Sequence, residues 1–341
     1  MLMVVLGAGA SYDSVPFLTG NPGYRERPPL ADELFQDRPD FLNVMQRFPV
    51  CQAIIPLVQM PASGGTVEQV LEHLQSESDE YPERHKQLAA IRYYLHVMLW
   101  ECEQRWRGIG RGISNYKTLL DQIERWREPD EQVCLVTFNY DRMIEDALPV
   151  VGVNIHDLSD YVGSKTYKLI KLHGSVNWGR LVHTHVLSIR DKNVWDVAYE
   201  MIDRIQELNI TDTFRIVNEL PMARSERDPD FALFPAIAIP VQTKQHFECP
   251  KEHVDALREF IPQTGKLLMI GWRAMEGHFL KLLADGLDHR LRVMAVSGSL
   301  DYAKQSVANL RNSGIDADAI ESTGGFTNFI ITREGDEFLR A

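Results

Sequence analysis

Six short apolar runs, each ending in glycine or polar residues, constrain the fold of this chain more than any other feature. A run of this length that is bounded by turn residues is typical of a buried β-strand. Helical segments follow several of the runs, and this pattern indicates a largely parallel sheet. The runs are LMVVL (2–6), QVCLVTFNYD (132–141), TYKLIKLHGSVNW (166–178), FALFPAIAIP (231–240), GKLLMIGWR (265–273) and LRVMAVSGS (291–299).

The order of these runs predicts an α/β fold, with a Rossmann-like, mostly parallel sheet, helices on both faces and a helical insertion. Apolar residues recur at helical spacing between 66 and 127, so we expect a core domain of 1–62 and 129–341 and a helical insertion at 63–128. We interpret the Trp, Tyr and Met residues of the insertion as packing between helices. The charged, weakly periodic region 181–227 is predicted to form two helices that serve as a lid or an assembly surface.

Charge and composition limit which binding partners and which cellular compartment we expect for this chain. The formal net charge of -12 repels a phosphate backbone, so we expect no direct nucleic-acid binding. No apolar run has the length of a membrane span and the N-terminus lacks signal-peptide features, so we expect a cytoplasmic protein without membrane contact. The four cysteines form no Cys-x-x-Cys pair, and we therefore expect neither a metal site nor a disulfide framework.

The first candidate binding motif is VVLGAGASYD (4–13), directly after the first apolar run. Glycines in this place let the backbone approach a pyrophosphate closely, and a helix that follows directs N–H groups at the charge. The motif departs from the usual dinucleotide fingerprint because Tyr12 stands where the third glycine belongs. A plain glycine turn remains the alternative. The candidate binding residues are Gly7, Ala8, Gly9, Ala10 and Ser11.

The second motif is TFNYD (137–141), which places a carboxamide and a carboxylate at the end of a buried strand. The carboxamide of Asn139 can orient a sugar hydroxyl or a water molecule there. The alternative is that Asn139 or Asp141 only caps a helix running to Leu148.

Three further strand ends carry candidate residues. His173 follows an apolar run, where a histidine is suited to general base catalysis because its ordinary pKa lies near operating pH; a structural histidine is the alternative. Gly271-Trp272 and Ser297 end later runs and are suited to binding adenosine or ribose hydroxyls, although either could be simple turn chemistry. The sequence has no Gly-x-Ser-x-Gly elbow, Gly-Lys-Ser/Thr phosphate loop or His-Glu-x-x-His zinc helix.

Taken in this order, the motifs resemble those of the sirtuin superfamily, and in particular its bacterial sirtuin-like branch that cleaves NAD in anti-phage defence. Sirtuins carry Gly-Ala-Gly-x-Ser, Thr-Gln-Asn-x-Asp and His-Gly, and the counterparts here are 7–11, 137–141 and 173–174. The resemblance extends to RPPLADELF (27–35), PVQTKQHFECP (240–250) and IGWR (270–273). It implies NAD+ as the substrate, catalytic roles for Asn139 and His173, contact of residues 7–11 with the NAD pyrophosphate, and support of the site by Thr137 and Asp141.

The sequence also departs from the sirtuin pattern. The zinc-ribbon cysteines of protein-deacylating sirtuins are absent, and Phe138 and Tyr140 replace the usual neighbours of the motif's asparagine. We therefore expect an NAD+ glycohydrolase that is restrained by homo-oligomerisation, a lid or a partner such as an ATPase. The alternatives are a silent NAD or ADP-ribose sensor, a protein deacylase or ADP-ribosyltransferase, and, least favoured, a dehydrogenase. Arg25, Arg27 and Arg273 could each meet the 2′-phosphate of NADP, so the sequence leaves NAD and NADP open.

Overall fold

The computed structural model describes residues 1–15, 27–59, 66–110, 114–187, 192–218, 220, 231–241 and 247–340. The chain folds into two compact units, unit 1 (1–30, 102–173 and 243–341) and unit 2 (31–101 and 174–242). Each unit has its own β-sheet. These boundaries differ from the predicted ones, and they cut the predicted insertion 63–128 between residues 101 and 102.

Unit 1 is built on a six-stranded parallel sheet with the order β3-β2-β1-β7-β8-β9. Counted along the chain within this sheet, the order is 3-2-1-4-5-6, which is that of a doubly wound dinucleotide-binding fold. The predicted Rossmann-like fold class is thereby confirmed. The strands are β1 (Leu2–Leu6), β2 (Val133–Thr137), β3 (Tyr167–Lys171), β7 (Lys266–Ile270), β8 (Leu291–Val296) and β9 (Ala317–Ser322).

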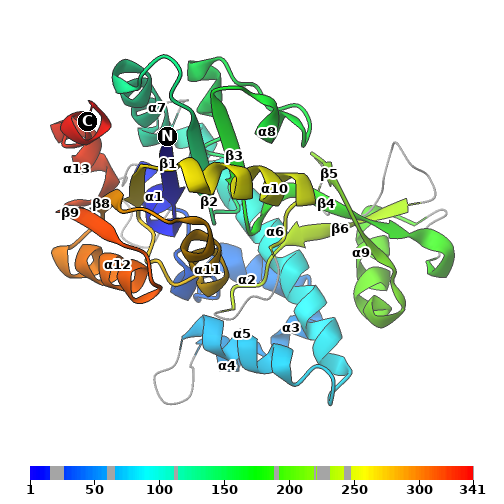
Figure 1. Cartoon of the computed structure of the whole chain (residues 1–341). Helices are drawn as coiled ribbons and strands as arrows, with labels where there is room; N and C mark the ends of the chain where they lie inside the picture. The colour runs from blue at the N-terminus through cyan, green and yellow to red at the C-terminus, as the bar shows by residue number, and fades with distance from the viewer. Residues whose placement is uncertain are drawn as a thin grey trace. The chain divides into compact units, whose positions relative to one another are not determined.

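Helices flank this sheet (Figure 1). Helix α7 (Asn115–Trp126) contacts both α13 (Gly325–Thr332) and α14 (Gly335–Arg340), and α13 also contacts α1 (Ala8–Ser14). Helices α8 (Asp160–Gly163) and α10 (Lys251–Phe260) pack along β3, and α12 (Leu300–Asn312) packs along β8 and β9. The remaining elements of unit 1 are α11 (Gly277–Gly286) and the 3₁₀ turns η3 (Leu148–Val151) and η6 (Ile261–Gln263).

The strands β1 and β2 are buried along their whole length because both faces of the sheet are covered there. All five residues of β1 and of β2 are buried, without the alternation of a half-exposed strand. Helix α7 begins after Ser114, whose side chain accepts a hydrogen bond from the Lys117 backbone N–H. Among the described residues, no helix is long and apolar enough to cross a bilayer.

Unit 2 contains a three-stranded antiparallel sheet with the order β5-β4-β6. Its strands are β4 (Gly174–His183), β5 (Ile210–Ile216) and β6 (Phe231–Ile237). Its helices are α2 (Pro39–Gln46), α3 (Pro49–Gln52), α4 (Ile55–Gln59), α5 (Val67–Ser76), α9 (Val194–Asp203) and the first part of α6 (Glu83–Gly110), with 3₁₀ turns η1 (Ala31–Glu33), η4 (Thr184–Val186) and η5 (Ile205–Glu207).

Two expectations for the middle of the chain are wrong. The described part of 181–227 contains one α-helix, α9, and the strand β5 instead of two helices. The apolar run 231–240 forms β6 and the second half of the run 166–178 begins β4, and both lie in the antiparallel sheet of unit 2. An apolar run predicts burial but does not determine which strand will be its neighbour.

Candidate functional site

The carboxyl ends of the parallel strands meet at one edge of the unit 1 sheet. Leu6 pairs with both Thr137 and Ile270, and Thr137 pairs in turn with Lys171. Ile270 pairs with Val296, so the sequence motifs that follow these strands all begin at the same level. Open α/β sheets bind ligands in the crevice at this edge, where the strand order reverses. Here the reversal lies between β1 and β7.

The glycines at this reversal point pack against one another. The Gly7 N–H donates to Ile270 O (3.0 Å) and the Gly9 N–H donates to Gly271 O (3.2 Å). A Cβ atom on Gly7 would lie 2.3 Å from Gly271 O, and Gly271 itself has a φ of +59°. The sequence needs glycine at these positions because the β1–α1 turn touches the end of β7.

Asn139 joins the end of β2 to the turn after β1. Its side-chain Nδ2 donates to Gly7 O (2.9 Å) and Ser11 Oγ (2.9 Å), and it lies 3.3 Å from Tyr116 Oη. Because a backbone carbonyl can only accept, the contact with Gly7 fixes which end of the amide faces the turn. The Asn139 side-chain oxygen accepts no hydrogen bond from the described residues, so it is the end available to a ligand.

Ser11 and Asp141 complete this polar cluster. Ser11 Oγ lies 2.8 Å from Tyr116 Oη, and both side chains are buried. Burial raises the pKa of the Asp141 carboxyl to about 6, against the lowering effects of the nearby Lys171 ammonium and of a hydrogen bond from Ser11. The carboxyl therefore changes its charge near pH 6, within the pH range in which many enzymes are active.

The loop after Asp141 is not the predicted helix. Residues 143–147 form turns that lead into η3. The Asp141 carboxylate accepts the Met143 backbone N–H (3.0 Å), and the fully buried Lys171 donates from Nζ to the Asp141 backbone carbonyl. The Asp141 side chain thus binds a following backbone N–H as a helix cap would, but the segment continues as turns and not as a helix.

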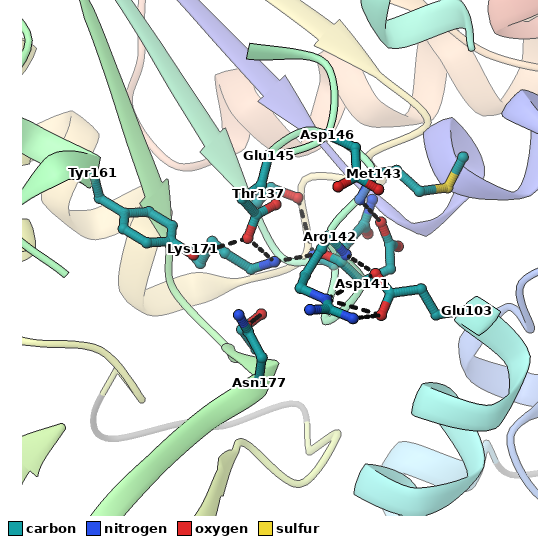
Figure 2. Close-up of polar contacts among 12 residues, drawn as sticks. Glu103, Thr137, Asp141, Arg142, Met143, Glu145, Asp146, Tyr161, Lys171 and Asn177 are labelled. Carbon is teal, nitrogen blue, oxygen red and sulfur yellow. Dashed lines mark hydrogen bonds and ion pairs between the residues drawn. The ribbon is translucent and has the colours of Figure 1, made fainter. Parts of the chain in front are cut away.

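Buried ion pairs hold the same loop (Figure 2). Lys171 Nζ lies 2.9 Å from Glu145 Oε1, which also accepts a hydrogen bond from the Tyr161 hydroxyl (3.0 Å). Arg142 binds both carboxylate oxygens of the fully buried Glu103, with its Nη2 2.9 Å from Oε2. The backbone that carries Asn139 and Asp141 is thus tied to strand β3 and to helix α6.

An aromatic cluster lies beside the polar one. The Phe138 ring lies 4.9 Å from the His173 ring and stacks on the Trp272 ring at 5.7 Å (centroid distances). The Tyr140 ring is 6.2 Å from the His173 ring. The Trp272 Nε1 donates to Glu276 Oε2 (2.5 Å). His173 is therefore buried beside the Phe138 and Tyr140 rings, just after the end of β3.

Some of the other predicted site residues bond to the residues described above, and others do not. Ala8, Gly9 and Ala10 lie in the first turn of α1, and Ala10 is buried. Thr137 Oγ1 donates to Leu6 O (3.2 Å) and accepts the Asn139 N–H (3.1 Å), so its hydroxyl supports the backbone of the site. The Ser297 N–H donates to Ser322 O, and this residue bonds to none of the others.

The structure places two of the three arginines considered for a 2′-phosphate. Arg27 lies over the Tyr12 ring at 4.8 Å, and Arg273 lies over the Tyr302 ring at 5.9 Å. Arg25 lies outside the described residues, as does part of the run 240–250.

Sequence reasoning missed three contributors to the site. Tyr116 was interpreted as helix packing, and Lys171 and Glu145 were not singled out. Lys171 did give a signal, because a lysine interrupts an otherwise apolar run at the end of a strand and must find a partner if that strand is buried. Tyr116 gave none, since an aromatic residue on the apolar face of a helix is ordinary.

The cysteines take no part in this cluster. All four are buried and none forms a disulfide, and burial raises the thiol pKa of Cys51, Cys134 and Cys249 to about 12. Among the residues that the structure describes, no group of three or more His, Cys, Asp or Glu side chains is arranged to hold a metal ion.

Comparison with protein-family models and with curated proteins finds no match. Among solved structures, a Sir2-homologue mutant in complex with 2′-O-acetyl-ADP-ribose is 14% identical, with a TM-score of 0.40, and the match covers 99% of this chain and 90% of that one. Sir2 bound to an acetylated peptide is 11% identical, with a TM-score of 0.38 and coverage of 100% and 94%. Sir2Tm bound to a propionylated peptide is 12% identical, with the same TM-score and coverage. These values assign no activity to the chain.

Proposed function

We propose that this chain is an NAD+ glycohydrolase, which cleaves the bond between nicotinamide and ribose. The observation that carries the proposal is the arrangement of Asn139 at the carboxyl edge of the sheet. Its amide nitrogen is held by Gly7 O and Ser11 Oγ, and its side-chain oxygen remains available. His173 follows the neighbouring strand β3. A hydrogen-bond acceptor and a potential base therefore lie just after the ends of two adjacent strands.

The strand ends offer a surface on which NAD+ could lie. The resemblance assigns the pyrophosphate to residues 7–11, which form the tight β1–α1 turn at the reversal point of the sheet. Gly271, Trp272 and Ser297 follow the next two strands, β7 and β8, and would contact the adenosine half. The nicotinamide ribose would then lie toward Asn139 and His173.

The reaction needs a water molecule and a proton acceptor. Water attacks C1′ of the nicotinamide ribose as the C1′–N bond breaks, and the bonding electrons neutralise the pyridinium nitrogen of nicotinamide. The transition state resembles an oxocarbenium ion, as in other glycosidic cleavages. The Asn139 oxygen would accept a hydrogen bond from this water or a ribose hydroxyl, and His173 would take the proton, directly or through the ribose hydroxyls.

Control of the activity is part of the proposal, because unrestrained loss of NAD+ would poison the cell. The resemblance implies a role in anti-phage defence, with restraint by self-assembly or by a partner such as an ATPase.

The test is nicotinamide release from NAD+ by the purified chain, with and without the product of its neighbouring gene. We expect release, and a loss of about a hundred-fold or more in Asn139→Ala and in His173→Ala if the two residues act in general acid–base chemistry. His289→Ala is the matched control, because His289 bonds to Thr264 O at the opposite end of β7. It should leave release unchanged.

The same assay separates the alternatives. Release that requires an acylated peptide would favour a deacylase. Bound NAD+ or ADP-ribose without release under any condition would contradict the glycohydrolase and favour a sensor. Equal release by wild type and by Asn139→Ala would show that the cleavage takes place elsewhere.

A further inference from the structure

Tyr116 reaches the candidate site from helix α7. Its side chain is fully buried, and its ring packs edge-on against Phe326 at 5.6 Å between centroids. Its hydroxyl oxygen lies 2.8 Å from Ser11 Oγ and 3.3 Å from Asn139 Nδ2. The hydroxyl thus contacts two predicted site residues that come from other parts of the chain.

Part of the hydrogen-bond pattern follows from the chemistry of the groups. The Asn139 Nδ2 can only donate, and its two hydrogens face three acceptors, Gly7 O, Ser11 Oγ and Tyr116 Oη, so one hydrogen is shared. Between Ser11 and Tyr116, either hydroxyl can donate to the other. The result is a buried network in which the Ser11 and Tyr116 hydroxyls bond to each other and both accept from the Asn139 amide.

Packing requires only the ring of Tyr116. A phenylalanine would fill the same space against Phe326, whereas the hydroxyl is used entirely on Ser11 and Asn139. A buried hydroxyl that makes no hydrogen bond lowers the stability of the fold. The Tyr116 hydroxyl avoids this cost because Ser11 and Asn139 supply its hydrogen bonds.

We propose that Tyr116 is a positioning residue that holds the Asn139 amide with its oxygen directed to the ligand. The catalytic consequence rests on the proposed function, but the positioning itself does not. In this role Tyr116 acts through Asn139 and Ser11, the two residues that its hydroxyl contacts.

The test compares Tyr116→Phe with Tyr94→Phe. Tyr94 is also fully buried and donates its hydroxyl to Leu34 O (2.7 Å) in unit 2, so both variants lose one buried phenol hydrogen bond. The first readout is the NMR signal of the Asn139 side-chain amide, assigned by its loss in Asn139→Ala. We expect this signal to shift and to exchange faster with solvent in Tyr116→Phe, and to stay unchanged in Tyr94→Phe.

The second readout is nicotinamide release. Loss of this orienting contact should lower kcat by about ten-fold while KM stays near the wild-type value, because the role proposed for Tyr116 is to orient Asn139 and not to bind substrate. Tyr94→Phe should change neither constant. In a double-mutant cycle, Ser11→Ala should reduce the further effect of Tyr116→Phe, since both remove the hydrogen bond between the two hydroxyls.

Failure of the proposed function and failure of the positioning role give different results in these experiments. If wild type releases no nicotinamide, the proposed function fails and the amide signal alone decides the role of Tyr116. An Asn139 signal that is the same in Tyr116→Phe and Tyr94→Phe would overturn the positioning role, whatever the activity. A shifted signal with an unchanged kcat would overturn its importance for catalysis.

Discussion

Lys171 shows how one side chain can fix a loop that bears functional groups. Its ammonium is fully buried at the end of β3, where it pairs with Glu145 and donates to the Asp141 backbone carbonyl. A buried ion pair adds little net stability over an apolar pair of equal volume, because both charges lose their hydration. We expect its effect to lie in specificity, because the pair joins the loop after Asp141 to the end of β3.

Removal of only the lysine should therefore be damaging. Lys171→Met leaves the Glu145 carboxylate buried without its cation, and we expect the free energy of unfolding to fall by about 3–5 kcal/mol. Adding Glu145→Gln to this variant should restore part of the loss, because the uncompensated charge is gone. Urea unfolding measures both effects.

The control for this prediction is the exposed pair Lys281–Asp285, whose nitrogen and oxygen lie 2.7 Å apart. Lys281→Met should cost at most about 1 kcal/mol, because water screens an exposed pair. If Lys171→Met costs no more than Lys281→Met, the buried pair does not hold the loop.

At the residue scale, the sequence predicted the polar side chains at the strand ends better than it predicted the residues that these side chains contact. Asn139, Asp141 and His173 follow apolar runs directly, and parallel strand ends share an edge, so their convergence was foreseeable. The contact of Tyr116 with Asn139 joins residues 23 positions apart, and its contact with Ser11 joins residues 105 positions apart. Such distant pairs depend on how α7 packs, which local patterns do not specify.

At the element scale, the β1–α1 turn and the end of β7 form one tightly packed junction. Gly7 and Gly271 approach so closely that neither has room for a side chain. The glycine motif predicted from sequence therefore has a structural function in addition to any contact with phosphate. The plain-turn alternative and the binding interpretation are compatible, because a tight junction also leaves the backbone open to a ligand.

Substitution at this junction should be costly. The Cβ of Gly7→Ala would lie 2.3 Å from Gly271 O, so the backbone must shift. We expect the free energy of unfolding to fall by more than about 1 kcal/mol. Gly163→Ala is the matched control, since a Cβ there meets nothing within 4 Å, and it should be neutral or slightly stabilising. Thermal melts of the two variants compare the effects, and equal melting temperatures would contradict a tight junction.

Prediction of elements failed where tertiary contacts override local preference. Met143, Ile144, Ala147 and Leu148 are spaced as on a helix face and all are buried, yet their segment forms turns and a 3₁₀ turn. The same loop is held by bonds of Lys171 to the Asp141 backbone and to Glu145, which come from a distant strand and leave no trace in the local pattern. By contrast, β1, β2, β7 and β8 were foreseen because short, mostly apolar runs bounded by turn residues are typical of buried strands.

At the scale of the whole molecule, the two units contain buried titratable groups with opposite responses to acid. In unit 2, burial lowers the pKa of the fully buried His96 from 6.5 to about 3. In unit 1, burial raises the pKa of Asp141 from 3.8 to about 6. The unfolded chain has the ordinary value in both cases.

These shifts determine the sign of each contribution to stability. The contribution of His96 is present above pH 6.5 and is lost as pH falls toward about 3, because only the unfolded chain takes up the proton. The contribution of Asp141 is fully present below pH 3.8 and is lost as pH rises through about 6. Between pH 6 and 3.8, acid therefore weakens unit 2 through His96 and strengthens unit 1 through Asp141.

We predict that acid unfolding begins in unit 2. Hydrogen exchange measured across this pH range should show amides of α6 near His96 losing protection before those of β1 and β2. In His96→Phe, the free energy of unfolding should fall less steeply with acid, by up to about 1.4 kcal/mol per pH unit, because the buried neutral imidazole is gone. Earlier loss of protection in β1 and β2, or an unchanged slope in His96→Phe, would show that other buried groups govern the response to acid.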